Sequence, residues 1–310
     1  MLNGVPQGSI LGPYLFLLYI NDFVNCTDLF NFTLYADDAT LHTAGPNINS
    51  LITNANHNLR QVSNWILSNK LNLNTNKTHF VIFHRNKEMP HILPELRFDS
   101  KIIKRTYCTK FLGVKVDQSL SWSQNIQDIV SKISKQRGIM YHMRNVLSTE
   151  AFKQIYYSLI YLHLTYCNVV WSGVPKNRLK CLFIAQKKVM RCIARLHRYG
   201  HTNAAFRELN ILKFYELNDY CSATYVFKCL RCPDNTMFNY RNNSQYALRN
   251  ASLLQLPFCN SSQSKTVIDY RGPKIWNTLP ENLRNKPTFE AFKKTLKQYF
   301  VAKYNYNNVE

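Results

Sequence analysis

The chain has 310 residues, with 39 Lys and Arg against 18 Asp and Glu, which gives a formal net charge of +21. Its 45% hydrophobic residues can form a folded core, which excludes a disordered tail, and only nine glycines exclude collagen-like or glycine-rich repeats. The charge is uneven, because residues 1–140 carry a net +5 and residues 141–310 a net +16. Such an excess of positive charge favours polyanionic partners, nucleic acid above all, and places the cationic surface in the second part of the chain.

Cysteine usage indicates the cellular compartment. The nine cysteines are an odd number scattered over a long chain, which is typical of reduced intracellular thiols rather than of a disulfide framework. The apolar run Leu15–Ile20 follows no basic leader and is too short to cross a bilayer. We therefore expect a soluble intracellular protein of the nucleus or cytoplasm, neither secreted nor bound to a membrane.

The first 120 residues are predicted to alternate between helices and strands. The expected elements are, in chain order, an apolar buried helix at 14–23, strands at 31–36 and 39–42, an amphipathic helix at 51–66, and strands at 79–84, 97–104 and 107–116. This order favours an α+β fold in which an antiparallel sheet carries helices on one face.

After residue 117 the pattern becomes helical. Three apolar stripes at helical spacing are Ile126, Ile129, Val130, Ile133 and Met140; Phe152, Tyr156, Leu159 and His163; and Leu182, Ala185, Val189, Ile193 and Leu196. Residues 232–272 are rich in Asn, Ser and Pro and are expected to form a loop. A last helix is predicted to begin after Thr288 as its N-cap, with Phe289, Phe292, Leu296 and Phe300 on one face.

The sequence Tyr35-Ala36-Asp37-Asp38 carries the strongest chemical signal. Asp37 and Asp38 fall where a two-residue turn between strands is expected, and two adjacent carboxylates repel each other. A bound divalent cation would remove that repulsion, and carboxylate oxygens suit Mg²⁺. The alternative is a solvated Asp-rich turn, since this tetrapeptide pattern arises by chance in roughly one of 25 chains of this length.

Further motifs surround this turn. They are Gly4-Val5-Pro6-Gln7-Gly8-Ser9-Ile10-Leu11-Gly12-Pro13, Tyr19-Ile20-Asn21-Asp22, Trp65, Asn69-Lys70-Leu71, Asn74, Lys77-Thr78, Phe111-Leu112-Gly113-Val114 and Leu120-Ser121-Trp122. Together they resemble the reverse transcriptase of non-LTR, LINE-type, jockey-like retrotransposons. The resemblance is specific to about residue 135 and continues more loosely through Gln186-Lys187-Lys188, His201-Thr202 and Gly272-Pro273-Lys274-Ile275-Trp276-Asn277-Leu279-Pro280, which look like the tail after the polymerase.

The resemblance implies roles for individual residues. Asp37 and Asp38 are the expected catalytic metal ligands, with Tyr35 and Ala36 beside the primer terminus. Pro6, Gln7 and Gly8 are expected to line the template and nucleotide pocket, where a glycine permits close approach of the backbone. Phe111, Leu112 and Gly113 match the strand that grips the primer end. Lys77 and Thr78 match a palm element with a structural or backbone-contacting role.

The resemblance also implies an architecture and partners. Residues 1–120 would form a partial palm with the primer grip, residues 121–230 a helical thumb or connection, and residues 231–310 a basic C-terminal extension. The expected activity is RNA-directed DNA polymerisation with two Mg²⁺ ions, Mn²⁺ being an alternative. The partners would be an RNA template, a DNA primer and deoxynucleotides, while protein partners are left open.

One departure from the family pattern affects activity. The fingers and a further metal-binding aspartate lie upstream of the Pro-Gln-Gly turn in this family, and neither Asp22 nor Asp28 takes the place of that aspartate. The chain is therefore expected to be a fragment that is inactive by itself. The alternative is a non-catalytic, basic nucleic-acid-binding remnant of a mobile element.

Two weaker signals lie in the second part of the chain. Lys187, Arg191, Arg195 and Arg198 have a helical spacing that could follow a phosphate backbone, or could form a solvated helix face. Cys229 and Cys232 have the spacing of half a zinc site, but no second pair follows them, so structural thiols are the preferred interpretation.

Overall fold

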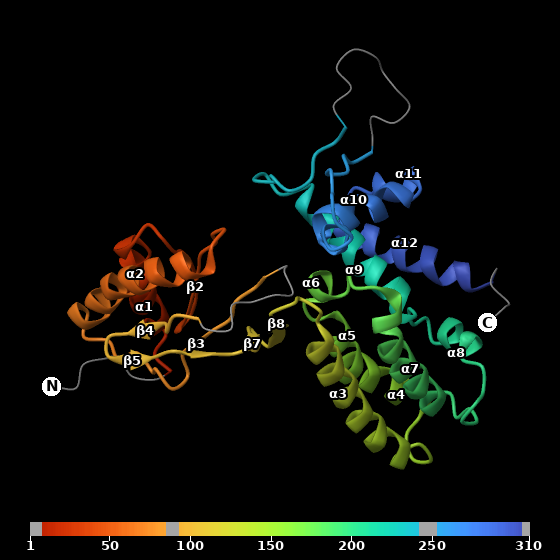
Figure 1. Cartoon of the computed structure of the whole chain (residues 1–310). Helices are drawn as coiled ribbons and strands as arrows, with labels where there is room; N and C mark the ends of the chain where they lie inside the picture. Colours follow the sequence, from red (N-terminus) through yellow and green to blue (C-terminus); the bar gives the residue numbers. More distant parts are fainter. Residues whose placement is uncertain (1–7, 85–92, 242–252, 306–310) are drawn as a thin grey trace. The chain divides into compact units, whose positions relative to one another are not determined.

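The computed structural model describes residues 8–84, 93–241 and 253–305, and the chain divides into two compact units (Figure 1). Unit 1 comprises Met1–Thr109 and Gln118–Leu120, and unit 2 comprises Lys110–Asp117 and Ser121–Glu310. The two segments 121–230 and 231–310 therefore belong to one compact unit.

Unit 1 combines two α-helices with short strands. Its elements are α1 (Gly12–Ile20), the 3-10 helix η1 (Asn21–Cys26), β1 (Asn31–Tyr35), β2 (Asp38–His42), α2 (Ile48–Ser68), β3 (His79–Phe80), β4 (Arg97–Phe98), β5 (Lys101–Ile102) and β6 (Lys104–Arg105), and it ends within β7 (Cys108–Phe111).

Among the described residues the strands form four two-stranded pairs, so the expected single antiparallel sheet is wrong, although the mixed α+β composition is confirmed. The pairs are β1–β2, β3–β6, β4–β5 and β7–β8 (Val114–Asp117), and β3–β6 is parallel. The segment predicted as one strand at 97–104 turns at Asp99, whose φ is +52°, so β4 and β5 pair with each other as a hairpin. Within the described ranges, β4 and β5 pair only with each other.

The core of unit 1 lies between η1, α2 and the β4–β6 segment. Phe23 is the central side chain, with its ring centroid 4.7 Å from that of Trp65 and 5.1 Å from that of Phe32. Val62 and Ile66 supply the buried face of α2, in agreement with its predicted amphipathic pattern. Phe32 is half-buried against this core, and this contact anchors the β1–β2 hairpin.

Helix α1 is mostly exposed, so the prediction of a buried helix is wrong for most of it. Tyr14, Leu17 and Leu18 are 67%, 57% and 76% exposed, and only Gly12 and Ile20 of the helix are buried. The apolar residues surround the whole helix, whereas its contact with the rest of unit 1 comes from its C-terminal end and η1.

Unit 2 is almost entirely helical. Its elements after β8 are α3 (Ser123–His142), α4 (Thr149–Ile155), the π-helix η2 (Tyr156–Tyr161), α5 (Leu162–Thr165), α6 (Asn168–Trp171), α7 (Lys176–Ile193), α8 (Asn203–Glu208), α9 (Phe214–Cys229), η3 (Ser264–Thr266), α10 (Ile268–Thr278), α11 (Glu281–Arg284), α12 (Phe289–Ala302) and η4 (Lys303–Asn305).

The helical run from α4 through η2 to α5 forms the centre of unit 2. Its fully buried residues are Phe152, Tyr156, Ile160 and Leu164, one at every fourth position. In an α-helix four residues overshoot one turn by about 40°, so this stripe would drift around the helix. The wider π-turn corrects the drift. Leu159, which was predicted to share the buried face, is instead 44% exposed.

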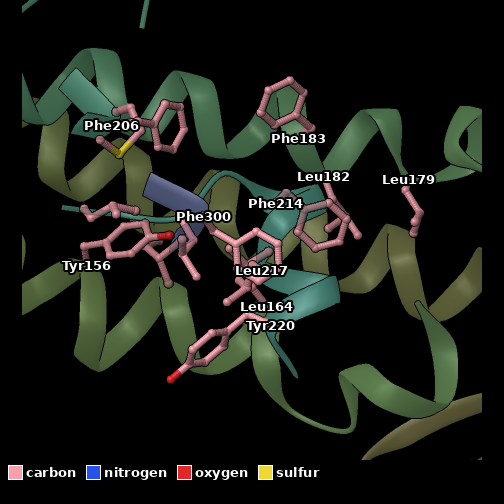
Figure 2. Close-up of a cluster of buried hydrophobic side chains, with 14 of the residues drawn as sticks. Tyr156, Leu164, Leu179, Leu182, Phe183, Phe206, Phe214, Leu217, Tyr220 and Phe300 are labelled. Atoms are coloured by element: carbon pink, nitrogen blue, oxygen red, sulfur yellow. The ribbon is translucent and has the colours of Figure 1, made fainter. Parts of the chain in front are cut away.

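Further helices pack against this run and against one another to complete the core. Figure 2 shows side chains from α7, α8, α9 and α12 gathered around Tyr156 and Leu164. Gln186 of α7 lies fully buried among them, and its amide nitrogen donates to the hydroxyl of Tyr156 and to the carbonyl of Leu212, both at 2.9 Å. The predicted last helix is confirmed as α12, since the Thr288 hydroxyl accepts the amide of Ala291 at 3.2 Å.

The Gly-Pro-Lys-Ile-Trp-Asn motif joins the C-terminal helices to α9. A Cβ atom on Gly272 would lie 2.9 Å from Cγ2 of Val226, so only glycine allows α10 to approach α9 this closely. Trp276 is buried, and the Asn277 side chain accepts the amide of Leu254 at 2.8 Å and donates to its carbonyl at 2.9 Å. These contacts give the motif a structural role within unit 2.

A buried polar network links α6, α9 and α10. The Asn168 side chain donates to that of Asn218 at 2.8 Å and accepts from the Ser172 hydroxyl at 3.0 Å. Arg271 donates to the same hydroxyl at 3.0 Å and to the carbonyl of Val169 at 3.0 Å. These hydrogen bonds offset the desolvation of the Asn and Ser side chains and link the three helices, although Nε of Arg271 is buried without a hydrogen-bond partner among the described residues.

Among the described residues, every helix is too short or too polar to cross a lipid bilayer.

Two helical glycines provide a matched test of the packing in unit 2. Gly272→Ala should lower the free energy of unfolding by about 1–3 kcal/mol, because the added methyl group collides with Val226. Gly138→Ala in α3 meets no atom within 4 Å, so it should raise stability by about 0.5–1 kcal/mol through helix propensity. Urea denaturation followed by circular dichroism measures both, and changes of the same sign would contradict this packing.

Stability should also depend on pH through Asp219. Burial raises the pKa of Asp219 above its ordinary value of 3.8, despite the nearby positive charge of Arg271. Between the ordinary and the raised pKa the folded chain holds this proton and the unfolded chain does not, so stability falls as pH rises through that window. Asp219→Asn should therefore become more stable relative to the wild type as pH rises from about 4 to 7. Urea denaturation at several pH values tests this, and a pH-independent difference would contradict it.

Candidate active site

The carboxylate pair lies at the tip of the β1–β2 hairpin in unit 1. The register pairs Tyr35 with Asp38, Leu34 with Ala39 and Phe32 with Leu41. The two-residue turn is thus Ala36-Asp37 rather than the predicted Asp37-Asp38, and Asp38 is the first residue of β2.

Side-chain alternation explains the orientation of the hairpin. Phe32, Leu34 and Leu41 share one face, which packs against the unit 1 core. The opposite face carries Tyr35 and Asp38 into solvent, and Tyr35 is 62% exposed. Ala36 has a φ of +51°, a left-handed conformation that a side chain disfavours, and it turns the chain so that Asp37 stands at the exposed tip.

The two aspartates offer part of a metal site. Both are exposed, and their carboxylate oxygens are hard donors of the kind that Mg²⁺ binds. In the part of the chain that the structure describes, no three His, Cys, Asp or Glu side chains come together in a way that could hold a metal ion. Asp37 and Asp38 therefore fit a divalent cation as two ligands of a larger set.

The predicted template and nucleotide pocket is only partly described. Pro6 and Gln7 lie outside the described residues. Gly8 has a φ of +85°, which glycine adopts at little cost, and no atom lies within 4 Å of a Cβ placed on it. The space beside this glycine is therefore open among the described residues, and its role in a template and nucleotide pocket stays a prediction.

The predicted primer-grip residues form the turn between β7 and β8. Leu112 and Gly113 have φ values of +44° and +86°, so both turn residues are left-handed, and Phe111 precedes them as the half-buried end of β7. These three residues belong to unit 2, whereas Asp37 and Asp38 belong to unit 1.

The Leu-Ser-Trp motif after β8 forms a capped turn before α3. The carboxylate of Asp117 accepts the amides of Ser121 at 3.0 Å and Trp122 at 2.7 Å. Leu120 and Trp122 have positive φ values, so the carboxylate holds an otherwise strained chain reversal. The carboxylate of Asp117 thus has a structural role, because it stabilises this turn.

The Asn and Lys-Thr motifs after α2 also have structural partners. The Asn69 side chain donates to the carbonyl of Trp65 at 2.9 Å and ends α2. The Asn74 carbonyl accepts the Thr78 hydroxyl at 3.0 Å and the Lys77 amide at 3.0 Å. These bonds form the turn that leads into β3.

The four predicted phosphate-contacting residues do not lie on one helix, so the prediction of a shared helix face is wrong. Helix α7 ends at Ile193, and Arg195 has a φ of +52° beyond it. Arg191 donates to the carbonyl of Gly200 at 2.9 Å and Arg195 to that of Leu147 at 3.2 Å. Lys187 lies over the ring of Phe183 at 4.4 Å, and Arg198 over that of Tyr199 at 5.7 Å.

All nine cysteines lie among the described residues and none of them forms a disulfide, including Cys229 at the end of α9 and Cys232 just after it. Burial raises the pKa of Cys221 to about 12, so its thiol stays protonated at neutral pH.

Comparison with known protein families shows which family the first part of the chain resembles. Residues 1–116 match the family model described as "Reverse transcriptase (RNA-dependent DNA polymerase)". This segment belongs to the reverse transcriptase family. The matched range includes the carboxylate hairpin of unit 1 and the Phe111–Gly113 turn of unit 2.

Curated relatives extend the similarity beyond this segment. The chain is 26% identical over 221 residues to the RNA-directed DNA polymerase from mobile element jockey of Drosophila melanogaster, covering 68% of this chain and 24% of the relative. It is 24% identical over 234 residues to the probable RNA-directed DNA polymerase from transposon X-element of the same species, covering 71% and 25%. The jockey polymerase of Drosophila funebris is 24% identical, covering 68% and 24%.

These alignments are longer than the 116 residues of the family match and so include part of unit 2. The chain is therefore similar to jockey-type RNA-directed DNA polymerases over about two thirds of its length, and it spans about a quarter of the length of these relatives. No solved structure matches it.

The structure also identifies a residue that the sequence motifs do not indicate. The hydroxyl of Tyr166 donates to the carbonyl of Leu112 at 2.6 Å, so it touches the predicted primer-grip turn from the helical part of unit 2. No local pattern points to it, because 54 positions separate the two residues.

Removal of the Asp117 carboxylate should destabilise the start of α3. Asp117→Ala should cost about 2–4 kcal/mol, because two charge-assisted bonds to half-buried amides are lost. Asp128→Ala is the matched control, since its exposed ion pair with Lys115 should contribute less than about 1 kcal/mol. Urea denaturation of both variants provides the comparison, and equal losses would show that Asp117 is not the cap.

Proposed function

We propose that this chain is the catalytic-carboxylate and primer-binding part of an RNA-directed DNA polymerase of a mobile element. The observation that carries the proposal is the pair Asp37 and Asp38 at the exposed tip of a hairpin, within a segment of the reverse transcriptase family. The relatives' names describe RNA-directed DNA polymerases, and the complete activity is proposed for a complete protein that contains this segment.

The proposed reaction is nucleotidyl transfer from a deoxynucleotide to the 3′ end of a DNA primer on an RNA template. Two Mg²⁺ ions would activate the primer hydroxyl and stabilise the charge on the leaving pyrophosphate. Asp37 and Asp38 would be their ligands in this chain. The exposed Tyr35 and Ala36 would lie beside the primer end, and Gly8 with its two preceding residues beside the template and nucleotide.

The exposed position of the carboxylates supports this role. A hairpin whose apolar face is anchored by Phe32 and Leu41 can hold two like charges at its tip without burying them. The cost of their repulsion is small in water and would be removed by a cation when the site is closed over by substrate. A purely structural turn has no such need for two adjacent carboxylates.

We further propose that residues 1–120 act as palm and primer grip, residues 121–230 as a helical thumb and residues 231–310 as a basic extension. The net charge of +16 over residues 141–310 supports contact with a nucleic-acid backbone. Lys187, Arg191, Arg195 and Arg198 remain candidates for such contact, from the end of α7 and the loop after it.

A second candidate is a basic nucleic-acid-binding protein without catalysis. The observation that favours it is the helical unit 2, whose own core holds together residues that carry most of the positive charge. Such a protein would bind RNA and DNA with a steep dependence on salt and would not need Asp37.

One substitution separates the two candidates. In a complete reverse transcriptase that contains this segment, Asp37→Asn should reduce primer extension by more than about 100-fold, because a metal ligand loses its charge. Binding of the RNA–DNA duplex, measured by fluorescence anisotropy, should stay within about twofold, since backbone contacts dominate affinity.

The control is Asp28→Asn, which makes the same charge change at another exposed aspartate of unit 1 and should leave extension intact. Full extension by the Asp37 variant would refute the catalytic role. A wild-type protein that binds the duplex but never extends it would favour the non-catalytic candidate.

A further inference from the structure

The turn between β7 and β8 has a conformation that needs support. Leu112 has a φ of +44°, and a leucine in the left-handed region costs roughly 1–2 kcal/mol compared with the right-handed region. The following Gly113, with a φ of +86°, adopts the left-handed region without this strain because it has no side chain. A strained residue of this kind persists where neighbouring groups hold it in place.

Tyr166 supplies that support. Its hydroxyl donates to the Leu112 carbonyl at 2.6 Å, and its ring lies 3.5 Å from the position of a Cβ on Gly113. One side chain therefore makes a hydrogen bond to the first turn residue and covers the second. A side chain at position 113 would meet an unfavourable φ, and its Cβ would lie in ordinary van der Waals contact with the tyrosine ring.

The backbone of Tyr166 is fixed in the core of unit 2. Its amide donates to the Leu162 carbonyl at 2.9 Å, which ends α5, and its carbonyl accepts the indole N–H of Trp171 at 2.9 Å. Trp171 is fully buried and stacks on Phe214 of α9 with ring centroids 6.3 Å apart. A chain of contacts thus runs from the helical core to the turn through Tyr166.

We propose that Tyr166 is a positioning residue for the primer end, acting through the Phe111–Gly113 turn. This inference rests on the proposed polymerase function, in which that turn contacts the primer. Tyr166 would hold the turn in one conformation relative to the helices of unit 2, so that the helices and the turn bind the primer as one rigid part. Tyr166 is 53% exposed, so it is also accessible beside the turn.

The first experiment tests the positioning alone and uses the 310-residue chain. Tyr166→Phe removes only the hydroxyl, and the amides of the 111–114 peptide should then exchange with deuterium roughly three- to tenfold faster, as expected for the loss of one hydrogen bond. Tyr157→Phe is the matched control, because the Tyr157 hydroxyl also donates to a distant backbone carbonyl, that of Asn210, at 3.3 Å. The control should leave the exchange of this peptide unchanged.

The second experiment tests the role in extension and uses a complete reverse transcriptase that contains the segment. Tyr166→Phe should lower kcat for primer extension about three- to tenfold and leave the Kd for the RNA–DNA duplex unchanged, since a misplaced primer end affects chemistry rather than overall binding. A destabilised fold would instead lower the active fraction and leave the kcat per active-site-titrated enzyme unchanged.

The outcomes separate this inference from the proposed function. Unchanged exchange in Tyr166→Phe, or faster exchange with unchanged kcat, overturns the positioning role. If the wild-type complete protein does not extend a primer, the proposed function fails, and the exchange comparison still decides whether Tyr166 holds the turn.

Discussion

The buried stripe on the helical run from α4 to α5 is the constraint on which unit 2 depends. Phe152, Tyr156, Ile160 and Leu164 recur every four residues, and only a helix wider than an α-helix keeps them on one side. The run contacts α3, α7 and α9, and these in turn carry the remaining helices. Because the interior is closely packed, a drift of this stripe would separate α7 from α9, and Gln186 would lose both of its buried partners.

The motifs that resemble the family differ in role: one presents exposed carboxylates, whereas the others make contacts that stabilise the fold. Asp37 and Asp38 stand exposed at a hairpin tip with free carboxylates, whereas Asp117 uses its carboxylate on two backbone amides. Gly272 and Asn277 in the C-terminal motif allow close packing and pin a loop. Aspartate is therefore the proposed catalytic residue where its carboxylate is exposed, and it has a structural role where the carboxylate accepts backbone amides.

Several features could be predicted from local sequence because local physics decides them. Helix α2 follows from its apolar periodicity, α12 from the Thr288 cap, and the hairpin of β1 and β2 from alternating residues around a turn. The predicted turn, Asp37-Asp38, lies one residue after the observed turn, Ala36-Asp37. The reason is that Ala36 adopts a left-handed conformation that favours glycine or asparagine, so its residue type does not indicate a turn position. The expected single antiparallel sheet is wrong in part because the segment predicted as one strand at 97–104 reverses at Asp99, whose φ is +52°, and folds into the β4–β5 hairpin.

By itself the sequence determined the family motifs, the positive charge and the pairing of two carboxylates, since these depend on residue type and close spacing. Only the tertiary structure decided how distant residues meet. The contact of Tyr166 with Leu112 and the position of Gly272 against Val226 join residues tens of positions apart. Their reason is packing: a side chain's partners across a core are set by the directions of whole helices, which no local pattern encodes.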